Sequence, residues 1–211
     1  VAIALAEAGY YVTGLDLSPA MLERARQKVA SVPPAVAERL VFLQGDMSEF
    51  DLGRLFPLIL VPFRAFQHLV DPAAQRRALT CVHRHLRPGG HLVIDLFDPR
   101  LEFCLAGAPP LEEVREVEDP ANGHRIRRTV AGRDNDPFRQ LIRERIRLDV
   151  IDATGQVVMT EERSMALRWT LRQEMEYLLE LCGFRPIEQL SDFRAAPPAY
   201  GREQIWIAQA I

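Results

Sequence analysis

The amino-acid sequence predicts an α/β protein with a doubly wound, mostly parallel sheet. Short apolar runs alternate with longer segments in which apolar residues recur at helical spacing. Two of the helical segments begin with an N-cap residue followed by proline, at Ser18-Pro19 and Asp71-Pro72. Because parallel strands need a crossover that is usually a helix, this alternation favours a parallel sheet.

The predicted elements follow from local signals. An Ala-rich first helix ends at Gly9, and the last helix begins with the capping box Thr170-x-x-Gln173. The run that starts at Leu58 is continuously apolar, so we expect that strand to be buried on both faces. The expected strands of the core are Val12–Asp16, Leu40–Gln44, Leu58–Phe63, His91–Phe97, Pro186–Leu190 and Gln204–Ala208.

Residues 99–165 interrupt this pattern and predict an inserted antiparallel β meander. Between Ile142 and Val150, apolar residues alternate with charged ones, as in a half-exposed strand. A turn signal at residues 152–155 allows the next strand to return antiparallel. The core is therefore expected to comprise residues 1–98 and 166–211.

Composition excludes several classes of function. The 211 residues carry a net charge of −3, which gives no general attraction to nucleic acid. The longest apolar run, from Leu55 to Phe63, is about half the length that a bilayer-spanning helix needs, so no membrane partner is expected. The three cysteines contain no C-x-x-C pair, and we expect Cys81 and His85 to serve packing, so no metal site is predicted. These features favour a cytoplasmic protein with reduced cysteines; its oligomeric state is unknown.

Two carboxylates mark the predicted ligand site. Asp16 and Asp46 end successive strands, and a right-handed crossover brings both ends to the same side of the sheet, where open α/β sheets bind ligands. Asp16 can accept hydrogen bonds from the vicinal hydroxyls of a ribose, and Asp46 can accept one from the exocyclic amine of an adenine. Leu17, Met21 and Met47 supply apolar surface for the base. Each acid alone also fits a simple turn cap.

Four motifs extend this interpretation. They are V-T-G-L-D-L-S-P-A-M-L-E-R-A-R around Asp16, Q-G-D-M-S-E-F around Asp46 and Met47, L-R-P-G-G-H-L-V-I-D-L-F, and L-L-E-L-C-G-F-R-P-I. In this combination they resemble the class I S-adenosylmethionine-dependent methyltransferases. The resemblance implies S-adenosylmethionine as cofactor, Asp16 as its ribose ligand, and Asp46 and Met47 at its adenine. It also implies a Rossmann-like methyltransferase sheet whose last strand is antiparallel.

The chain departs from this family at its start. Val1 to Gly9 resembles the helix that follows the family's first strand and glycine-rich turn, and neither of those elements is present in the sequence. We therefore expect the chain to lack an amino-terminal segment and the sheet to have a gap between the Asp16 strand and the Leu58 strand. We also expect this chain to bind the cofactor poorly on its own.

The resemblance implies a methyl-transfer wall after the third strand, in the segment P-F-R-A-F-Q-H-L. His68 is the candidate catalytic base, with a structural hydrogen-bonding histidine as the alternative. Phe63 and Arg64 are candidate cofactor contacts. Gln67 is a candidate contact for the methyl acceptor, which is expected to be a small molecule.

The insertion is expected to form a lid over the acceptor pocket. Arg168 and Tyr200 are further candidate acceptor contacts, whereas Trp169 is expected to be part of the core. Between His124 and Arg147, eight arginines stand against three acids. That bias fits either a solvated sheet face or recognition of an anionic acceptor.

Two other classes of protein remain alternatives. An NAD(P)-dependent oxidoreductase also needs an acid like Asp16 for its ribose. Its short-chain type needs a Tyr-x-x-x-Lys pair, which is absent because Lys28 is the only lysine and does not follow a tyrosine by four residues. A degenerate, non-catalytic module with the same fold is the second alternative. Whether nitrogen, oxygen or carbon is methylated is not readable from the sequence.

Overall fold

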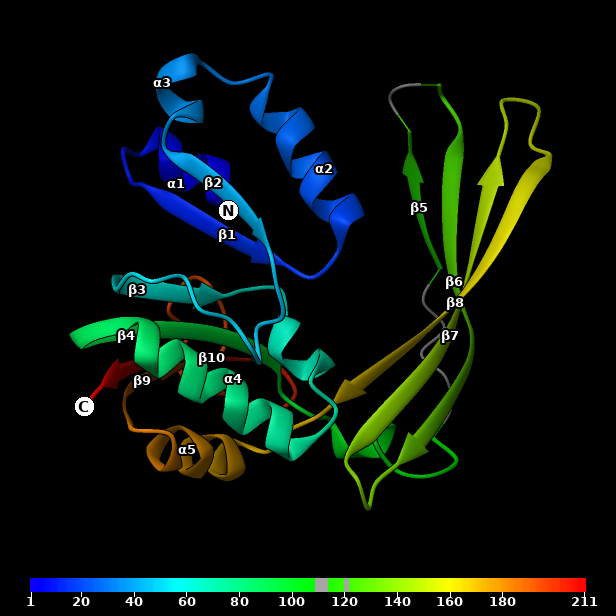
Figure 1. Ribbon diagram of the computed structural model, residues 1–211. Coiled ribbons are helices and arrows are strands. Elements are labelled where there is room, and N and C mark those ends of the chain that lie inside the picture. The colour runs from blue at the N-terminus through cyan, green and yellow to red at the C-terminus, as the bar shows by residue number, and fades with distance from the viewer. Residues whose placement is uncertain (109–113, 120–121) are drawn as a thin grey trace.

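The computed structural model describes residues 1–108, 114–119 and 122–211 (Figure 1). Its elements follow in the order α1 (Ala2–Glu7), β1 (Val12–Asp16), α2 (Pro19–Val29), α3 (Pro34–Ala37), β2 (Leu40–Gln44), β3 (Phe56–Val61), η1 (Ala65–His68), α4 (Pro72–His85), β4 (Leu86–Phe97), η2 (Leu101–Phe103), β5 (Val114–Glu118), β6 (Arg125–Asp136), β7 (Leu141–Ile151), β8 (Val157–Arg168), α5 (Arg172–Leu181), β9 (Phe184–Leu190) and β10 (Glu203–Ala210).

The described strands form three sheets. β1 pairs with β2 in parallel, and the second sheet has the order β3-β4-β10-β9. In that sheet β3 runs parallel to β4, whereas β10 runs antiparallel to both of its neighbours. No ladder joins β1 to β3 in the described part of the chain. The α/β class predicted from the sequence is confirmed.

The main hydrophobic core lies around the second sheet. Buried side chains of β4 and β10 pack with those of α4 and α5, and the fully buried ring of Phe66 from η1 joins them. On α4, Leu79 and Val82 are buried on the face that meets this core. Burial of a side chain of this size contributes roughly 1.5–3 kcal/mol, so this sheet is where most of the hydrophobic stabilisation is concentrated.

The prediction that the strand from Leu58 is buried on both faces is wrong. β3 spans Phe56–Val61, and Leu58 is 45% exposed. The reason is its position, since β3 pairs with β4 alone among the described strands and is an edge of its sheet. A continuous apolar run gives no signal for whether a strand has neighbours on both sides.

The predicted start of the last helix is also shifted. Thr170 does not cap α5; its hydroxyl is buried without a hydrogen-bond partner. The extended residue before the helix is Leu171, whose backbone N–H donates to the Glu174 carboxylate at 3.4 Å. In a capping box, the side chain of the third helical residue accepts the backbone N–H of the N-cap residue. Glu174 makes this bond to Leu171, one residue later than in the predicted Thr170/Gln173 pair.

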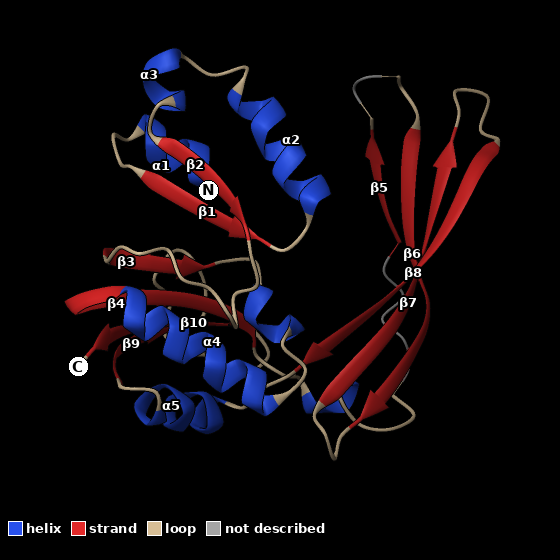
Figure 2. Cartoon of the chain, in the orientation of Figure 1, coloured by secondary structure: helices blue, strands red, loops and turns tan. Residues whose placement is uncertain are grey.

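The insertion forms the third sheet, a meander with the order β5-β6-β7-β8 in which neighbouring strands are antiparallel. Figure 2 shows it standing beside the α/β part as a separate group of long strands. β8 continues to Arg168, beyond the expected boundary at residue 165, because its ladder with β7 extends to the pair Leu141–Arg168. None of the helices in the described part of the chain combines the length and the hydropathy that crossing a membrane requires.

Candidate active site

The carboxyl ends of β1, β2 and β3 point to the side of the molecule that carries the β5–β8 sheet (Figure 1). Asp16 is the last residue of β1, opposite Gln44 of β2. The Gly45 N–H donates to the Asp16 carbonyl oxygen at 3.1 Å, which holds the two strand ends together. The two predicted carboxylates therefore leave the sheet at one edge, where parallel sheets bind ligands.

The Asp16 carboxylate organises the start of α2. One of its oxygens accepts the Ser18 N–H at 2.8 Å, and the Ser18 hydroxyl in turn accepts the Met21 N–H at 3.3 Å. Ser18 is thus the predicted N-cap, with Pro19 in the first turn. The second carboxylate oxygen of Asp16 has no hydrogen-bond partner among the described residues. Each oxygen retains acceptor capacity, which a pair of ribose hydroxyls requires.

Asp46 behaves similarly in the next turn. Its Oδ1 accepts both the backbone N–H and the hydroxyl of Ser48, at 2.7 and 2.8 Å. These bonds, led by the one from the backbone N–H, lower the pKa of Asp46 below its ordinary value. Asp46 is therefore ionised at neutral pH. The residue is also exposed to solvent. Its role at an adenine stays a prediction.

The three predicted apolar contacts differ from one another. Leu17 and Met21 are 66% and 55% exposed beside Asp16. Met47 instead packs against the main core and is partly buried. Leu17 and Met21 thus offer free apolar surface at this edge, whereas much of the Met47 side chain is used by the fold.

The segment after β3 has an unusual backbone. Phe63 and Arg64 both have positive φ, of 60° and 59°, in the left-handed region that non-glycine residues rarely occupy. Such a conformation costs of order 1–3 kcal/mol for each residue unless the surroundings compensate. The Phe63 ring is 79% exposed. The Arg64 guanidinium pairs with Glu203 of β10 and lies over the Phe97 ring, 5.7 Å from its centroid.

Asp95 is the residue of this region that the sequence analysis missed. It lies near the end of β4, is 6% exposed, and accepts the Arg64 N–H at 3.1 Å. Burial raises the pKa of its carboxyl, against the opposing effect of hydrogen bonds from the Arg64 and Phe63 backbone N–H groups. The sequence does hold one signal that could have indicated Asp95: it is the single acidic residue in the otherwise apolar run from Leu92 to Phe97.

His68 ends η1 and is exposed, as a base that meets a substrate needs to be. Its assignment as catalytic base stays a prediction. Tyr200 is also exposed, but its hydroxyl is engaged: it donates to Glu102 at 2.9 Å and accepts the Leu101 N–H at 2.8 Å. Tyr200 therefore fastens the segment after β4 to the segment before β10.

Gln67 is fully buried and uses both ends of its amide within the protein. Its oxygen accepts the Phe97 N–H at 2.9 Å, and its nitrogen donates to the Arg168 carbonyl at 3.4 Å. These contacts join η1, β4 and β8. They give Gln67 a structural role, so its amide is not free to contact an acceptor.

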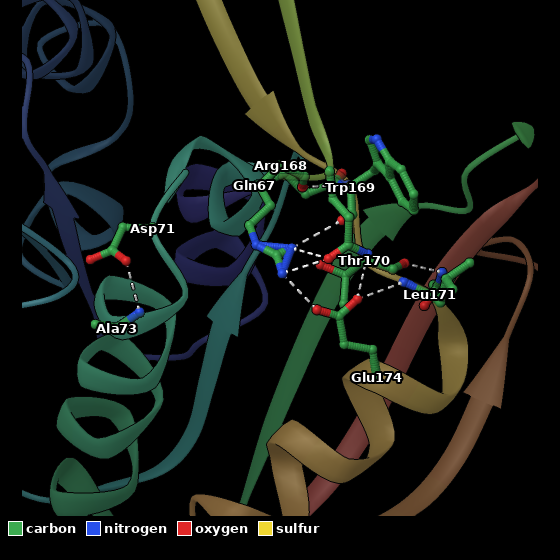
Figure 3. A network of polar contacts seen from close by, with 10 residues as sticks. Gln67, Asp71, Ala73, Arg168, Trp169, Thr170, Leu171 and Glu174 are labelled. Atoms are coloured by element: carbon green, nitrogen blue, oxygen red, sulfur yellow. Dashed lines mark hydrogen bonds and ion pairs between the residues drawn. The ribbon is translucent and has the colours of Figure 1, made fainter. Parts of the chain in front are cut away.

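Arg168 is likewise buried, in a network that Figure 3 shows. Its guanidinium donates to the Gln140 side-chain oxygen at 2.6 and 2.8 Å and to the Glu174 carboxylate at 2.7 Å. The Trp169 side chain packs beside it in a small cluster with Cys104 and Ile142, as expected of a core residue. Arg168 joins the inserted sheet to α5 and presents no exposed guanidinium to a ligand.

The arginines of the inserted sheet mostly face acids of the same sheet, which favours a solvated sheet face over a site for an anionic acceptor. The exposed pairs among them contribute little stability each, typically under about 1 kcal/mol, whereas the pair of Arg133 and Glu144 is buried. The pairs include Arg125 and Arg127 with Glu116, Arg128 and Arg133 with Glu144, Arg143 with Asp134, and Arg147 with Asp149.

Cys81 and His85 serve packing, as expected. His85 Nδ1 lies 2.7 Å from the Cys81 carbonyl oxygen, and its Nε2 accepts the Leu52 N–H at 2.9 Å. The Cys81 thiol contacts the Ser48 carbonyl at 3.5 Å. These bonds fasten the β2–β3 connection to α4. Across residues 1–108, 114–119 and 122–211, no cluster of three or more histidine, cysteine or acidic side chains is arranged to hold a metal ion.

Comparison with known proteins shows which class of protein the chain resembles. Residues 1–90 match a family described as a methyltransferase domain. The putative methyltransferase YqeM of Bacillus subtilis is 28% identical over 213 residues, covering 98% of this chain and 77% of that protein. The dTDP-4-amino-2,3,4,6-tetradeoxy-D-glucose N,N-dimethyltransferase of Saccharopolyspora spinosa is 40% identical over 86 residues, covering 40% of this chain and 30% of that protein.

A solved structure shares the fold. S-adenosylmethionine-bound CalS10, an amino pentose methyltransferase from Micromonospora echinaspora, superposes with a TM-score of 0.65 at 24% identity, over 95% of this chain and 74% of that one. The chain therefore matches a methyltransferase domain over residues 1–90 and shares the Rossmann-like α/β fold of solved S-adenosylmethionine-dependent methyltransferases. The oxidoreductase alternative gains no support from these relatives.

Proposed function

We propose that the protein transfers the methyl group of S-adenosylmethionine to a small-molecule acceptor, and that the acceptor atom is an amine nitrogen. The observation that carries the proposal is the pair of carboxylates at one sheet edge. Asp16 and Asp46 each use one oxygen in their own turn, and the remaining acceptor capacity faces solvent. Two separate acceptors at the ends of adjacent strands suit the ribose and the adenine of one nucleoside.

The bound cofactor supplies a sulfonium methyl group that is already activated for transfer. The protein therefore has to align the acceptor with that methyl group and exclude water. In the proposal Asp16 accepts the ribose hydroxyls, Asp46 the adenine amine, and Leu17 and Met21 cover the base. Phe63 and Arg64 form the wall beside the reacting groups. His68 accepts a proton where the acceptor has to lose one.

An amine is favoured as the methyl acceptor because two similar proteins methylate amino sugars. The Saccharopolyspora protein is an N,N-dimethyltransferase of a nucleotide-linked amino sugar, and CalS10 is an amino pentose methyltransferase. We propose that residues 99–165 cover the acceptor as a lid, attached to a core of residues 1–98 and 166–211. The buried contacts of Gln67 and Arg168 support a fixed attachment for this lid and leave acceptor recognition to other residues. The prediction of a cytoplasmic protein without nucleic-acid or membrane partners rests on composition alone.

The test uses the full-length protein with radiolabelled S-adenosylmethionine and a panel of amines, alcohols and thiols that includes amino sugars. We expect label to enter an amine. We also expect the Asp16→Ala variant to bind the cofactor roughly 100-fold more weakly, because the loss of two charge-assisted hydrogen bonds costs about 3 kcal/mol.

The matched control is Asp152→Ala. Asp152 also caps its own turn, through Thr154 and Gln156, but at the β7–β8 turn. Equal cofactor affinity in the Asp16→Ala variant and the control would reject the role of Asp16. Label in a thiol or alcohol alone would reject the amine.

A further inference from the structure

The backbone between β3 and η1 changes direction at a proline. Val61, the last residue of β3, lies opposite Ile94 in the parallel ladder with β4. The next residue, Pro62, has no N–H and cannot continue that ladder. The following residues, Phe63 and Arg64, then turn through the left-handed region, and their N–H groups need partners away from the strand.

Asp95 is the partner that the fold provides. It follows Ile94 in β4, so its carboxylate stands beside the point where the ladder stops. The Arg64 N–H donates to its Oδ2 at 3.1 Å, and the neighbouring Phe63 N–H acts with it to lower the pKa of the same carboxyl. At 6% exposed, Asp95 is screened from solvent and cannot readily exchange these donors for water.

The left-handed conformation of Phe63 and Arg64 determines where their two side chains point at the carboxyl end of β3. The Phe63 ring projects into solvent, and the Arg64 side chain turns toward Glu203 and the Phe97 ring. Either residue in an ordinary extended or helical conformation would point its side chain elsewhere. Since the pair lies at the carboxyl end of β3, it borders the edge that carries Asp16 and Asp46 (Figure 1).

We infer that Asp95 is a positioning residue for methyl transfer: it holds Phe63 and Arg64 in the left-handed conformation that forms the wall of the reaction site. This inference rests on the proposed function. Asp95 touches neither reactant, because its carboxylate is buried under the turn that it holds. Its effect on the reaction is exerted through the placement of its two neighbours in space.

The test compares Asp95→Ala and Asp95→Asn in the full-length protein. In Asp95→Ala we expect kcat to fall roughly 100-fold, as for a misplacement of about 1 Å, and the cofactor Kd to weaken much less than that, because Asp16 and Asp46 still hold the nucleoside. Asp95→Asn keeps one acceptor oxygen and is expected to recover most of the lost rate. Amide hydrogen exchange at Phe63 and Arg64 is expected to speed up in Asp95→Ala.

Asp98→Ala is the matched control. Asp98 is an equally buried carboxylate of the same segment, but it accepts the Gly201 N–H and the Gln204 amide instead. We expect its loss to leave exchange at Phe63 and Arg64 unchanged, which separates a local effect from general destabilisation.

Two results would overturn the inference: wild-type kcat in a folded Asp95→Ala variant, or unchanged amide exchange at the two residues. If the wild-type protein transfers no methyl group to any acceptor, the proposed function fails and the role in catalysis fails with it. The exchange measurement distinguishes that case, because it reports the hold of Asp95 on the turn without any substrate.

Discussion

The two sides of the candidate site use their polar residues in opposite ways. At the ends of β1 and β2, Asp16 and Asp46 cap their own turns and keep acceptor capacity toward solvent. Between η1, β8 and α5, the buried Gln67 and Arg168 spend their polar groups on other parts of the chain. The comparison teaches that burial separates residues available to a ligand from residues that hold the site together.

The largest effect that tests this difference is expected for Arg168→Ala. The change removes a buried guanidinium and leaves Gln140 and Glu174 without their shared donor, at a cost of about 3 kcal/mol in the free energy of unfolding. Denaturant unfolding measures it. Arg163→Ala is the control, because Arg163 lies on the same strand in an exposed pair with Glu161 and should cost under about 0.5 kcal/mol. Equal losses in the two variants would remove the distinction drawn between buried and exposed groups.

A smaller effect of opposite sign is expected for Thr170→Val. The Thr170 hydroxyl is buried without a hydrogen-bond partner, and valine has nearly the same shape. Removing the hydroxyl should raise the free energy of unfolding by up to about 1 kcal/mol, because no bond is lost and a desolvated polar group is removed. Thermal unfolding measures the change. A loss of more than 1 kcal/mol would mean that the hydroxyl does have a partner in solution.

The smallest effect on the free energy of unfolding is expected for Asp46→Asn, at the solvent-exposed carboxylate after β2. Its pKa in the folded protein lies below the ordinary value of 3.8, so ionised Asp46 contributes stability above that pH and loses it as the pH falls toward the folded-state pKa. The stability difference between the wild-type protein and Asp46→Asn should therefore be present at pH 6 and vanish at low pH. Chemical unfolding across this range measures it. A difference independent of pH would show that the Ser48 bonds do not favour the carboxylate form.

Much of this arrangement was predictable from local sequence. Asp16 ends a strand, Ser18 is an N-cap, and Pro19 lies in the first turn of the helix. The contact that Asp16 makes is to Ser18, only two residues further along the chain. The same holds for Asp71 and Pro72 at the start of α4. Signals of this kind depend on backbone geometry that the neighbouring residues set, so they can be interpreted without knowing the rest of the fold.

The errors arose where a residue depends on distant segments. Leu58 is exposed because its strand is an edge, and the roles of Gln67 and Arg168 come from partners that are up to 101 positions away in the chain. Asp95 was overlooked for the same reason, since its partners Phe63 and Arg64 belong to another strand's end. A polar residue in an apolar context predicts that a partner exists, but the fold decides which one.

The separation of β1–β2 from the other sheets has a consequence for cooperativity. Among the described strands these two pair only with each other, and the connection to β3 is fastened to α4 by contacts that include those of His85, Cys81 and Arg84. Such a unit can open independently of the larger core. A ligand that contacts Asp16 on one sheet and Arg64 on the other would make their opening a single event, and its binding free energy would then add to the stability of both.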